Sequence, residues 1–324
     1  MSKEEKKDLT KEQKLDSLIK KLNQDFGAGT IITNETLPEV ERFSSGSFSL
    51  DEALGGGWAR GRVIELVGNE SAGKSSIALH AVAEIQKLGG VAAYLDQEHA
   101  LDGLYAKALG VNLKDLLIVQ AFCAEDCLEI ADELSGSGAV DLVVIDSVAA
   151  LVPRAELEGK MSDQQMGLQA RLMSKAMRMM TGPAAKNGTT VMFINQFRDK
   201  INMYGGGKTQ SGGNALKYYS SQRVELWRPN KPVEKNGEPV GIQVEAKVIK
   251  NKVSAPFRKA SLFIRWGKGV DKYMDILRVA VEKDIITKSG AWHTYRDLRI
   301  QGEDNMAEVI KEKNLYEELV EKLK

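Results

Sequence analysis

The residues best suited to chemistry form the stretch GNESAGKS, residues 68–75, which fits the pattern G-x-x-x-x-G-K-[ST] and directly follows an apolar run. Gly68 and Gly73 let backbone N–H groups close around phosphate oxygens without obstruction by a Cβ atom. Lys74 then neutralises the β- and γ-phosphates, and the Ser75 hydroxyl is a ligand for Mg²⁺. A helix that begins near Lys74 adds its positive N-terminal end to the same site. The predicted binding residues of this loop are Gly68, Glu70, Ser71, Ala72, Gly73, Lys74 and Ser75.

Carboxylates follow two further apolar runs, where a Mg·ATP site needs them. Asp146 ends the run LVVID and is expected to hold the metal ion through water or together with Ser75. A solvated loop aspartate is the simpler alternative. Glu98, just past the run VAAYL, is the candidate general base for hydrolysis, whereas Asp96 beside it is expected to be structural. Tyr105, further along, is placed to stack on adenine.

A glycine-rich basic segment, 196–213, has no helix or strand pattern, and a long structureless segment in a compact domain is typically functional. We expect Gln196, at its start, to sense the γ-phosphate while the rest of the segment reaches another ligand. A second polar segment, 154–166, precedes a predicted helix over 167–180. That helix carries a basic stripe of Arg171, Lys175 and Arg178. Together these features predict a groove for a nucleic-acid backbone, with a mobile lid over ATP as the alternative.

The elements that must position these groups alternate along the chain. Short apolar runs separated by helical stretches favour an α/β fold with a mostly parallel twisted sheet covered by helices. The predicted strands are 63–67, 91–95, 116–120, 141–146 and 190–195. Later runs that alternate in period two predict an antiparallel extension of the sheet, and these are 223–227, 242–250 and 260–266.

Smaller parts flank this core. Thr10 and Gln13 form a capping box before an amphipathic helix, which either covers its own domain or packs on a neighbouring subunit. The apolar face of this helix consists of Leu15, Leu18, Ile19, Leu22 and Phe26. The last stretch mixes helix patterns with a turn-rich insert and predicts a small α+β domain. We place the domain boundaries at 1–35, 36–270 and 271–324.

Composition excludes several classes. The chain has 324 residues with 45 basic and 45 acidic side chains, so any attraction to nucleic acid needs a local patch. Two cysteines and three histidines disfavour a zinc site. The charged start MSKEEKKDLT is not a secretory signal, and no run of 18 residues is apolar. We therefore expect a soluble, cytoplasmic protein without a membrane partner.

With these residues in hand, nearly the whole chain resembles the RecA family of bacterial recombinases, which act in homologous DNA repair. The motifs that carry the resemblance are SSGSFSLDEALGGG, GNESAGKSS, DQEHALD, VDLVVIDSVAALVPRAELEG, MGLQARLMSKAMR, FINQFRDKI, SGGNALKYYSS and KVIKNKVSAPF. The resemblance implies an N-terminal helix and strand, a central ATPase core and a small C-terminal domain. It also implies ATP and Mg²⁺ as cofactors and a helical filament on single-stranded DNA that pairs with double-stranded DNA, with ATP bound between subunits.

By match of motif, the resemblance implies roles for individual residues. The nucleotide and hydrolysis roles fall on Lys74, Ser75, Ser76, Glu98 and Asp146. Asp102 and Tyr105 match adenine contacts, and Gln196 couples the γ-phosphate to DNA. Segments 154–166 and 197–213 match the DNA-binding loops. The predicted DNA-contacting residues are Met166, Arg171, Ser174, Arg178, Arg198, Lys200, Ile201, Gly212 and Gly213. Lys250 and Lys252 match lysines that reach a neighbour's ATP, so hydrolysis would wait for assembly. A LexA-like repressor is a further implied partner.

Some residues depart from the family pattern. The sequence ends at ELVEKLK without the acidic tail common in the family, so tail-based regulation is not expected. The second DNA loop is one residue shorter than usual, and Asp199 adds an acid to it. Tyr218 stands where phenylalanine is usual, and GGGWARGR lacks a customary proline. These departures remove no catalytic group, and they indicate a divergent member, of bacterial or phage origin, with altered regulation.

Other functions remain open on the sequence alone. A ring-forming helicase or motor on the same core usually adds a separate partner-binding or zinc-bearing domain, which this sequence has no room for. The second alternative is an ATP-switched scaffold on DNA. It would bind ATP as a recombinase does, but it would not exchange strands. The presence of Glu98 favours retained hydrolysis in either case.

Overall fold

The computed structural model describes residues 10–27, 29–33, 39–160, 167–199, 208–229, 231–235 and 237–323, without the side chains of 198, 199, 208 and 209. The chain divides into two compact units, 1–40 and 41–324.

The first unit contains helix α1, Lys11–Phe26. The predicted capping box is confirmed, because Gln13 N donates to Thr10 Oγ1 at 3.3 Å and Thr10 N donates to Gln13 Oε1 at 3.0 Å. None of the residues of α1 is buried, so its apolar face is not covered by the described part of the first unit. The predicted N-terminal strand does not occur among the described residues 10–27, 29–33 and 39–40.

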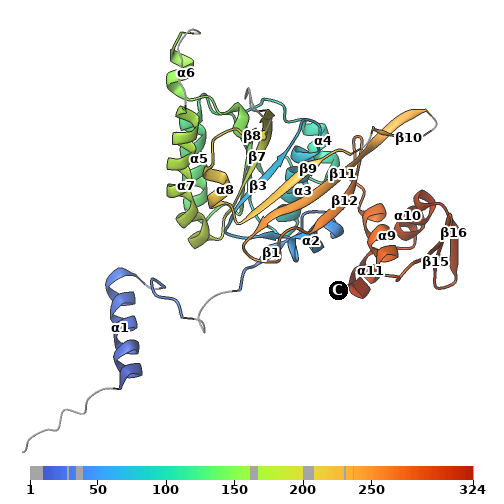
Figure 1. Ribbon diagram of the computed structural model, residues 1–324, viewed down its shortest axis with the longest axis horizontal. Helices are drawn as coiled ribbons and strands as arrows, with labels where there is room; N and C mark the ends of the chain where they lie inside the picture. The colour runs from blue at the N-terminus through green and yellow to red at the C-terminus, as the bar shows by residue number, and fades with distance from the viewer. Residues whose placement is uncertain are drawn as a thin grey trace, which may run out of the picture. The chain divides into compact units, whose positions relative to one another are not determined.

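The second unit is built on one large sheet with the strand order β13-β12-β11-β9-β3-β7-β6-β4-β5 (Figure 1). Its parallel strands are β3 (Val63–Gly68), β4 (Ala92–Asp96), β5 (Leu116–Val119), β6 (Leu142–Asp146), β7 (Thr190–Asp199) and β9 (Gln222–Trp227). Antiparallel strands β11 (Glu238–Asn251), β12 (Lys259–Arg265) and β13 (Gly269–Val270) extend it. Shorter strands β8 (Lys208–Gln210) and β10 (Val233–Lys235) pair with β7 and β11. The α/β fold class is confirmed.

One strand assignment was wrong. We predicted that 223–227 begins the antiparallel extension, but β9 pairs parallel with β3. The reason is the crossover after β7, in which the short helix α8 (Ala215–Tyr219) returns the chain to the end of the sheet where β3 starts. A strand that follows such a crossover runs in the same direction as the one before it. The antiparallel part therefore begins one strand later, at β11.

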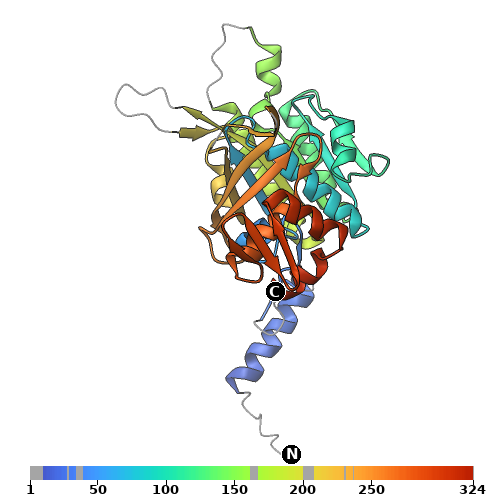
Figure 2. The same ribbon diagram turned by 90° about the vertical axis from the view of Figure 1, so that its right-hand side faces the viewer.

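Helices cover both faces of this sheet (Figures 1 and 2). One face packs against α2 (Phe48–Leu54), α3 (Lys74–Lys87) and α4 (Gly103–Ala108). The other packs against α5 (Ala124–Gly136), α7 (Leu168–Asn187) and α8. The two-residue strands β1 (Arg42–Phe43) and β2 (Trp58–Ala59) pair beside the sheet, and the 3₁₀ turn Val148–Ala150 and helix α6 (Arg154–Glu158) follow β6. Helix α7 continues past the predicted end at residue 180.

The C-terminal part has a core of its own. Helices α9 (Lys272–Glu282), α10 (Glu303–Glu312) and α11 (Tyr316–Leu323) surround the strands β14 (Thr287–Ser289), β15 (Trp292–Tyr295) and β16 (Leu298–Gln301). This part is attached to α2 through a buried carboxylate, because Asp275 accepts hydrogen bonds from the Ser47 hydroxyl at 2.9 Å and from the Ser49 backbone N–H at 3.2 Å.

Candidate nucleotide and DNA site

The phosphate-binding loop joins β3 to α3, in the context that the motif requires. Gly68 ends β3, and Lys74 is the first residue of α3. A Cβ atom on Gly68 would lie 2.2 Å from the Leu226 carbonyl oxygen, and one on Gly73 would lie 2.4 Å from Cδ1 of Ile264. Gly73 also has a φ of +79°. Both glycines are therefore needed for the backbone to form this turn, which is the cradle that accommodates phosphate oxygens.

Lys74 lies inside the turn. Its side chain is largely buried, and Nζ donates to the Asn69 carbonyl oxygen at 2.7 Å. Burial lowers its pKa, while the carboxylates of Asp146, Glu98 and Glu70 act in the opposite direction. An anion beside Nζ would relieve the desolvation of this ammonium, but the three carboxylates outweigh its single charge, so a phosphate needs a further cation in the cavity.

The predicted metal ligands meet at the carboxyl end of the sheet. Ser75 Oγ donates to Asp146 Oδ2 at 2.8 Å, as expected for two ligands of one cation. Tyr94, on β4, donates its hydroxyl to the same oxygen at 2.6 Å. Burial raises the pKa of Asp146, and the hydrogen bonds from Tyr94 and Ser75 oppose that rise. The donor set of one hydroxyl and one carboxylate suits a hard divalent cation such as Mg²⁺.

Glu98 lies across this end of the sheet and contacts β7. This strand leads into segment 197–213, the second predicted DNA loop, which is called the second DNA segment below. Gln196 Nε2 donates to Glu98 Oε1 at 3.2 Å, and the Ser147 hydroxyl donates to the same oxygen. Gln196 therefore touches the candidate base directly. Asp96 instead accepts the backbone N–H of Ala100 at 3.1 Å, in keeping with the predicted structural role.

The base-binding end of the cavity is partly different from the prediction. The cavity has a volume of about 570 Å³ and is lined by Ser76, Tyr105 and the side chain of Trp266, besides the loop itself. Tyr105 Oη and Ser76 Oγ are hydrogen-bonded at 2.8 Å. Asp102 caps α4 through the Leu104 N–H at 2.8 Å and does not line the cavity.

Three side chains in this region were missed by the sequence reasoning: Tyr94, Ser147 and Trp266. Tyr94 gave a weak signal, as a hydroxyl within the otherwise aliphatic run VAAYL. Ser147 follows the predicted metal ligand directly. Trp266 gave none, because it reaches the cavity only after the chain has returned through β12.

Helix α6 and the β7–β8 pair, which adjoin the two predicted DNA loops, lie at the same end of the core in both views (Figures 1 and 2). Gly212 N donates to Gln169 Oε1 at 3.1 Å, which connects the end of the second segment to α7. Arg171 and Arg178 are exposed on α7. Ser174 Oγ donates to its own helix, to the Ala170 carbonyl at 2.8 Å.

Close contacts also fix the glycines at the end of the second segment. Gly212 and Gly213 both have positive φ angles, and a Cβ on Gly213 would lie 2.8 Å from the Cβ of Ala170. Other predicted DNA-binding positions fall outside the described residues, namely Met166, Lys200, Ile201 and the side chain of Arg198.

Lys250 and Lys252 do not line the nucleotide cavity of their own chain. Lys250 Nζ donates to the carbonyls of Lys217 at 2.6 Å and Tyr218 at 2.9 Å, and Lys252 Nζ reaches the Tyr218 carbonyl at 3.4 Å. Both lysines thus lie at the C-terminal end of α8. Burial lowers the pKa of Lys250 to about 8, assisted by the positive charges of Lys252 and Arg223.

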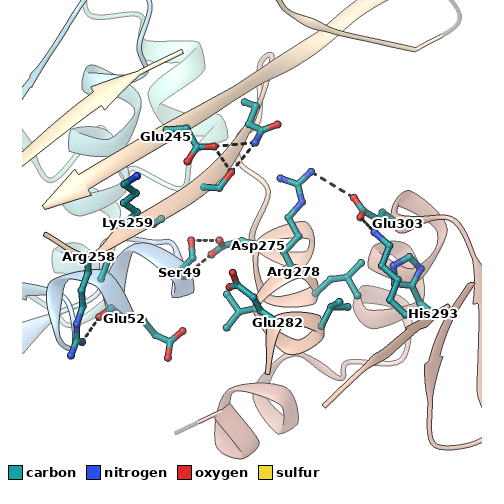
Figure 3. A pocket seen from close by; sticks show the side chains of 18 residues that line it. Ser49, Glu52, Glu245, Arg258, Lys259, Asp275, Arg278, Glu282, His293 and Glu303 are labelled. Carbon is teal, nitrogen blue, oxygen red and sulfur yellow. Dashed lines mark hydrogen bonds and ion pairs between the residues drawn. The ribbon is translucent and has the colours of Figure 1, made fainter. Parts of the chain in front are cut away.

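A cavity larger than the one at the phosphate-binding loop lies elsewhere, between the sheet, α2 and the C-terminal part (Figure 3). It has a volume of about 850 Å³, and none of the predicted site residues lines it. Acidic and basic side chains alternate along its walls, among them Glu52, Arg258, Asp275 and Arg278. Volume alone therefore does not mark the functional site of this protein.

Two further searches of the described ranges had negative results. No group of three or more His, Cys, Asp or Glu residues there is placed to hold a metal ion on its own. None of the helices in those ranges is both long and apolar enough to cross a membrane.

Comparisons with known proteins agree with the site. The RecA N-terminal domain model matches residues 13–271, and the RecA C-terminal domain model matches 274–324. Among curated relatives, Protein RecA of Thermus aquaticus is 48% identical over 315 residues, covering 95% of this chain and 93% of the relative. Protein RecA of Oceanobacillus iheyensis is 48% identical over 307 residues, covering 93% and 88%. That of Gloeobacter violaceus is 50% identical over 306 residues, covering 93% and 83%. The chain therefore belongs to the RecA family, and it is a recombinase of DNA repair.

Proposed function

We propose that this recombinase is a DNA-dependent ATPase that polymerises on single-stranded DNA as a helical filament and exchanges homologous strands. The observation that carries the proposal is the contact between Glu98 and Gln196. It joins a candidate catalytic carboxylate at the phosphate cavity to the strand that leads into the second DNA segment. A change at the phosphate cavity can therefore be transmitted through this contact to segment 197–213.

The residues of the cavity divide the work of nucleotide binding. The turn 68–73 and Lys74 would hold the phosphates, and Trp266 and Tyr105 line the end of the cavity where the base fits. Ser75 and Asp146 would hold Mg²⁺, which when bound neutralises the phosphate oxygens. The assignment is supported by the mutual hydrogen bond of Ser75 and Asp146, since two ligands of one cation must lie this close.

Glu98 is the proposed general base. A carboxylate in hydrogen-bond reach of the attacking water accepts its proton as the water adds to the γ-phosphate. Gln196 and Ser147 both donate to Glu98 Oε1, so they hold this carboxylate in place until Gln196 moves to another acceptor. The γ-phosphate is an acceptor of the right kind for an amide N–H.

The DNA contacts are proposed from charge and position. Arg171 and Arg178 are exposed on α7, near the attachment of both loops, and guanidinium groups bind phosphates through paired hydrogen bonds. The described part of the second segment ends in the tightly packed Gly212 and Gly213. This packing fixes the direction in which the segment leaves the core.

Assembly is proposed to complete the ATP site. Lys250 and Lys252 lie outside the cavity of their own chain, so their proposed role requires a second subunit that places its own cavity against them. The lowered pKa of Lys250 shows that its ammonium is partly desolvated, and an incoming phosphate would relieve this cost. We also propose the domain boundaries 1–35, 36–270 and 271–324.

The test is ATP hydrolysis by the full chain with and without single-stranded DNA, over a series of salt concentrations. Nucleotide binding is followed separately through the fluorescence of Trp266, with Trp266→Phe as the control for the other tryptophans. We expect strong stimulation by DNA that fades as salt rises. Turnover that is already maximal without DNA would instead favour the motor or scaffold functions, and strand exchange with labelled duplex would distinguish these.

A further inference from the structure

A fully buried carboxylate interrupts the central strand of the sheet. Glu65 lies in the middle of β3 and has no exposed surface. An ionised side chain in a sheet core is costly unless both of its oxygens are paired. The nucleotide mechanism above makes no use of Glu65, so its partners must explain why a charge is tolerated there.

The two neighbouring strands supply those partners. Asn195, on β7, donates from Nδ2 to Glu65 Oε1 at 2.9 Å, and Arg223, on β9, donates from Nε to Glu65 Oε2. Asn195 is 1% exposed and the Arg223 side chain is 11% exposed. A buried ion pair between β3 and β9, together with the Asn195 amide on β7, therefore connects three neighbouring parallel strands.

Each partner continues to the returning end of the second DNA segment. Asn195 Nδ2 also donates to the Ser211 carbonyl at 3.2 Å, and Arg223 Nη2 donates to Gln210 Oε1 at 3.1 Å. Gln210 and Ser211 are themselves buried. Glu65 thus fixes two consecutive residues of that segment through two separate routes.

Asn195 is also connected to the cavity at the phosphate-binding loop, through Gln196. Its Oδ1 accepts the backbone N–H of Gln196 at 2.9 Å, and Gln196 donates to Glu98. All three polar contacts of the Asn195 amide are therefore engaged at once, to Glu65, to Ser211 and to Gln196. A displacement of Gln196 that moves its backbone N–H would therefore act on the other two contacts of this amide.

We infer that Glu65 and Arg223 are positioning residues whose buried ion pair couples the state of Gln196 at the nucleotide cavity to the placement of Gln210 and Ser211 at the DNA segment. This inference rests on the proposed function, because it supplies the internal connection between its two ligands. Neither residue lines the cavity at the phosphate-binding loop. Both act through the side chains that they hold.

The same pair extends toward the residues proposed to act on a neighbour. Arg223 lies close enough to Lys250 to lower the pKa of its ammonium, and Glu65 acts in the opposite direction. The register of the sheet places Arg223 beside Lys250 on adjacent strands. Loss of the pair would therefore change the charge environment of Lys250 as well as the position of the DNA segment.

The experiment compares two single-stranded DNA affinities of the full chain. Fluorescence anisotropy of labelled oligothymidylate gives the dissociation constant with ATPγS and without nucleotide, and their ratio is the coupling factor. The variants are Glu65→Gln, which keeps the shape but not the charge, and Glu65→Leu combined with Arg223→Met, which removes both charges. The matched control is Glu245→Gln, since Glu245 accepts the Ser261 hydroxyl at 2.8 Å on β11, away from the DNA segment.

We expect the coupling factor to fall at least tenfold in both variants and to stay unchanged in Glu245→Gln. The affinity for ATPγS, followed at Trp266, should stay within twofold of the parent chain. A folded variant that keeps the full coupling factor would overturn the inference, and so would unfolding of both variants, because the pair would then serve stability alone. If the parent chain itself shows no effect of ATPγS on DNA affinity, the proposed function fails instead.

Discussion

Lys74 is a buried side chain whose proposed role is to bind phosphate and assist catalysis rather than to hold the fold together. Its ammonium lies among three carboxylates, and in the described chain its hydrogen bond goes to the carbonyl of Asn69 within the same turn. It makes no contact that joins distant parts of the sheet. Removal of the ammonium therefore acts on the phosphate site and leaves the core packing in place.

We expect Lys74→Ala to lower ATP turnover by about 100-fold or more, because it removes a preorganised cation from the charge that develops on the phosphates. The unfolding temperature should change little. DNA-stimulated hydrolysis and thermal unfolding are measured on the same preparation, with Lys87→Ala at the exposed end of α3 as the control. Normal turnover in Lys74→Ala would remove the phosphate-binding assignment.

Asp51 gives the protein a pH-dependent stability. Burial raises the pKa of this carboxyl to about 6, although Ser44 and Ser45 donate hydrogen bonds to it. Since the folded value exceeds the ordinary value of 3.8, the folded chain binds the proton more tightly than the unfolded chain. The contribution of Asp51 to the free energy of unfolding is fully present below about pH 4 and is lost as the pH rises through about 6.

We therefore expect Asp51→Asn to stabilise the protein relative to the parent chain more at about pH 7.5 than at about pH 5. Each pKa unit corresponds to about 1.4 kcal/mol. We expect the stabilisation by Asp51→Asn to be larger at the higher pH than at the lower pH by at least about 1 kcal/mol. Chemical unfolding at both pH values measures this stabilisation, with the exposed Asp297→Asn as the control. Equal stabilisation at both pH values would show that burial does not raise the pKa of Asp51 in the folded protein.

At the scale of elements, the apolar runs predicted the parallel strands well, because a strand buried on both faces reads as a continuous apolar stretch. The phosphate-binding loop was predictable for a similar reason, since its residues are consecutive. Glu65 could not be understood from the run VIELV, because its partners lie about 130 and 158 residues further along the chain. Trp266 and the parallel pairing of β9 depend likewise on how distant segments return to the sheet.

Helix α7 is the element whose exposed face is proposed to meet the DNA backbone. We expect Arg171→Ala combined with Arg178→Ala to weaken single-stranded DNA binding. The slope of log affinity against log salt concentration should become shallower by about 0.7 for each lost phosphate contact. Lys186→Ala, at the opposite end of the same helix, is the control. Binding measured over a salt series decides, and an unchanged slope in the double variant would place the DNA elsewhere.

At the scale of the whole molecule, the first unit has an apolar surface that its own described residues do not cover. Leu15, Leu18 and Phe26 of α1 are 55%, 50% and 73% exposed. An amphipathic helix gains most of its stability from packing of its apolar face. We therefore expect a second copy of the chain to cover this face when the protein assembles.

Leu18→Asp should abolish assembly, because a charge at the centre of the apolar face makes its burial unfavourable. ATP binding, followed at Trp266, should stay unchanged, because α1 and the nucleotide cavity belong to different units. Gln24→Asp adds the same charge to the opposite, exposed face of α1 and serves as the control. Light scattering or sedimentation with and without single-stranded DNA measures the assembly. Retained filament formation in Leu18→Asp would show that α1 contributes no contact between subunits, and loss of assembly in both variants would indicate an effect of charge on the helix as a whole.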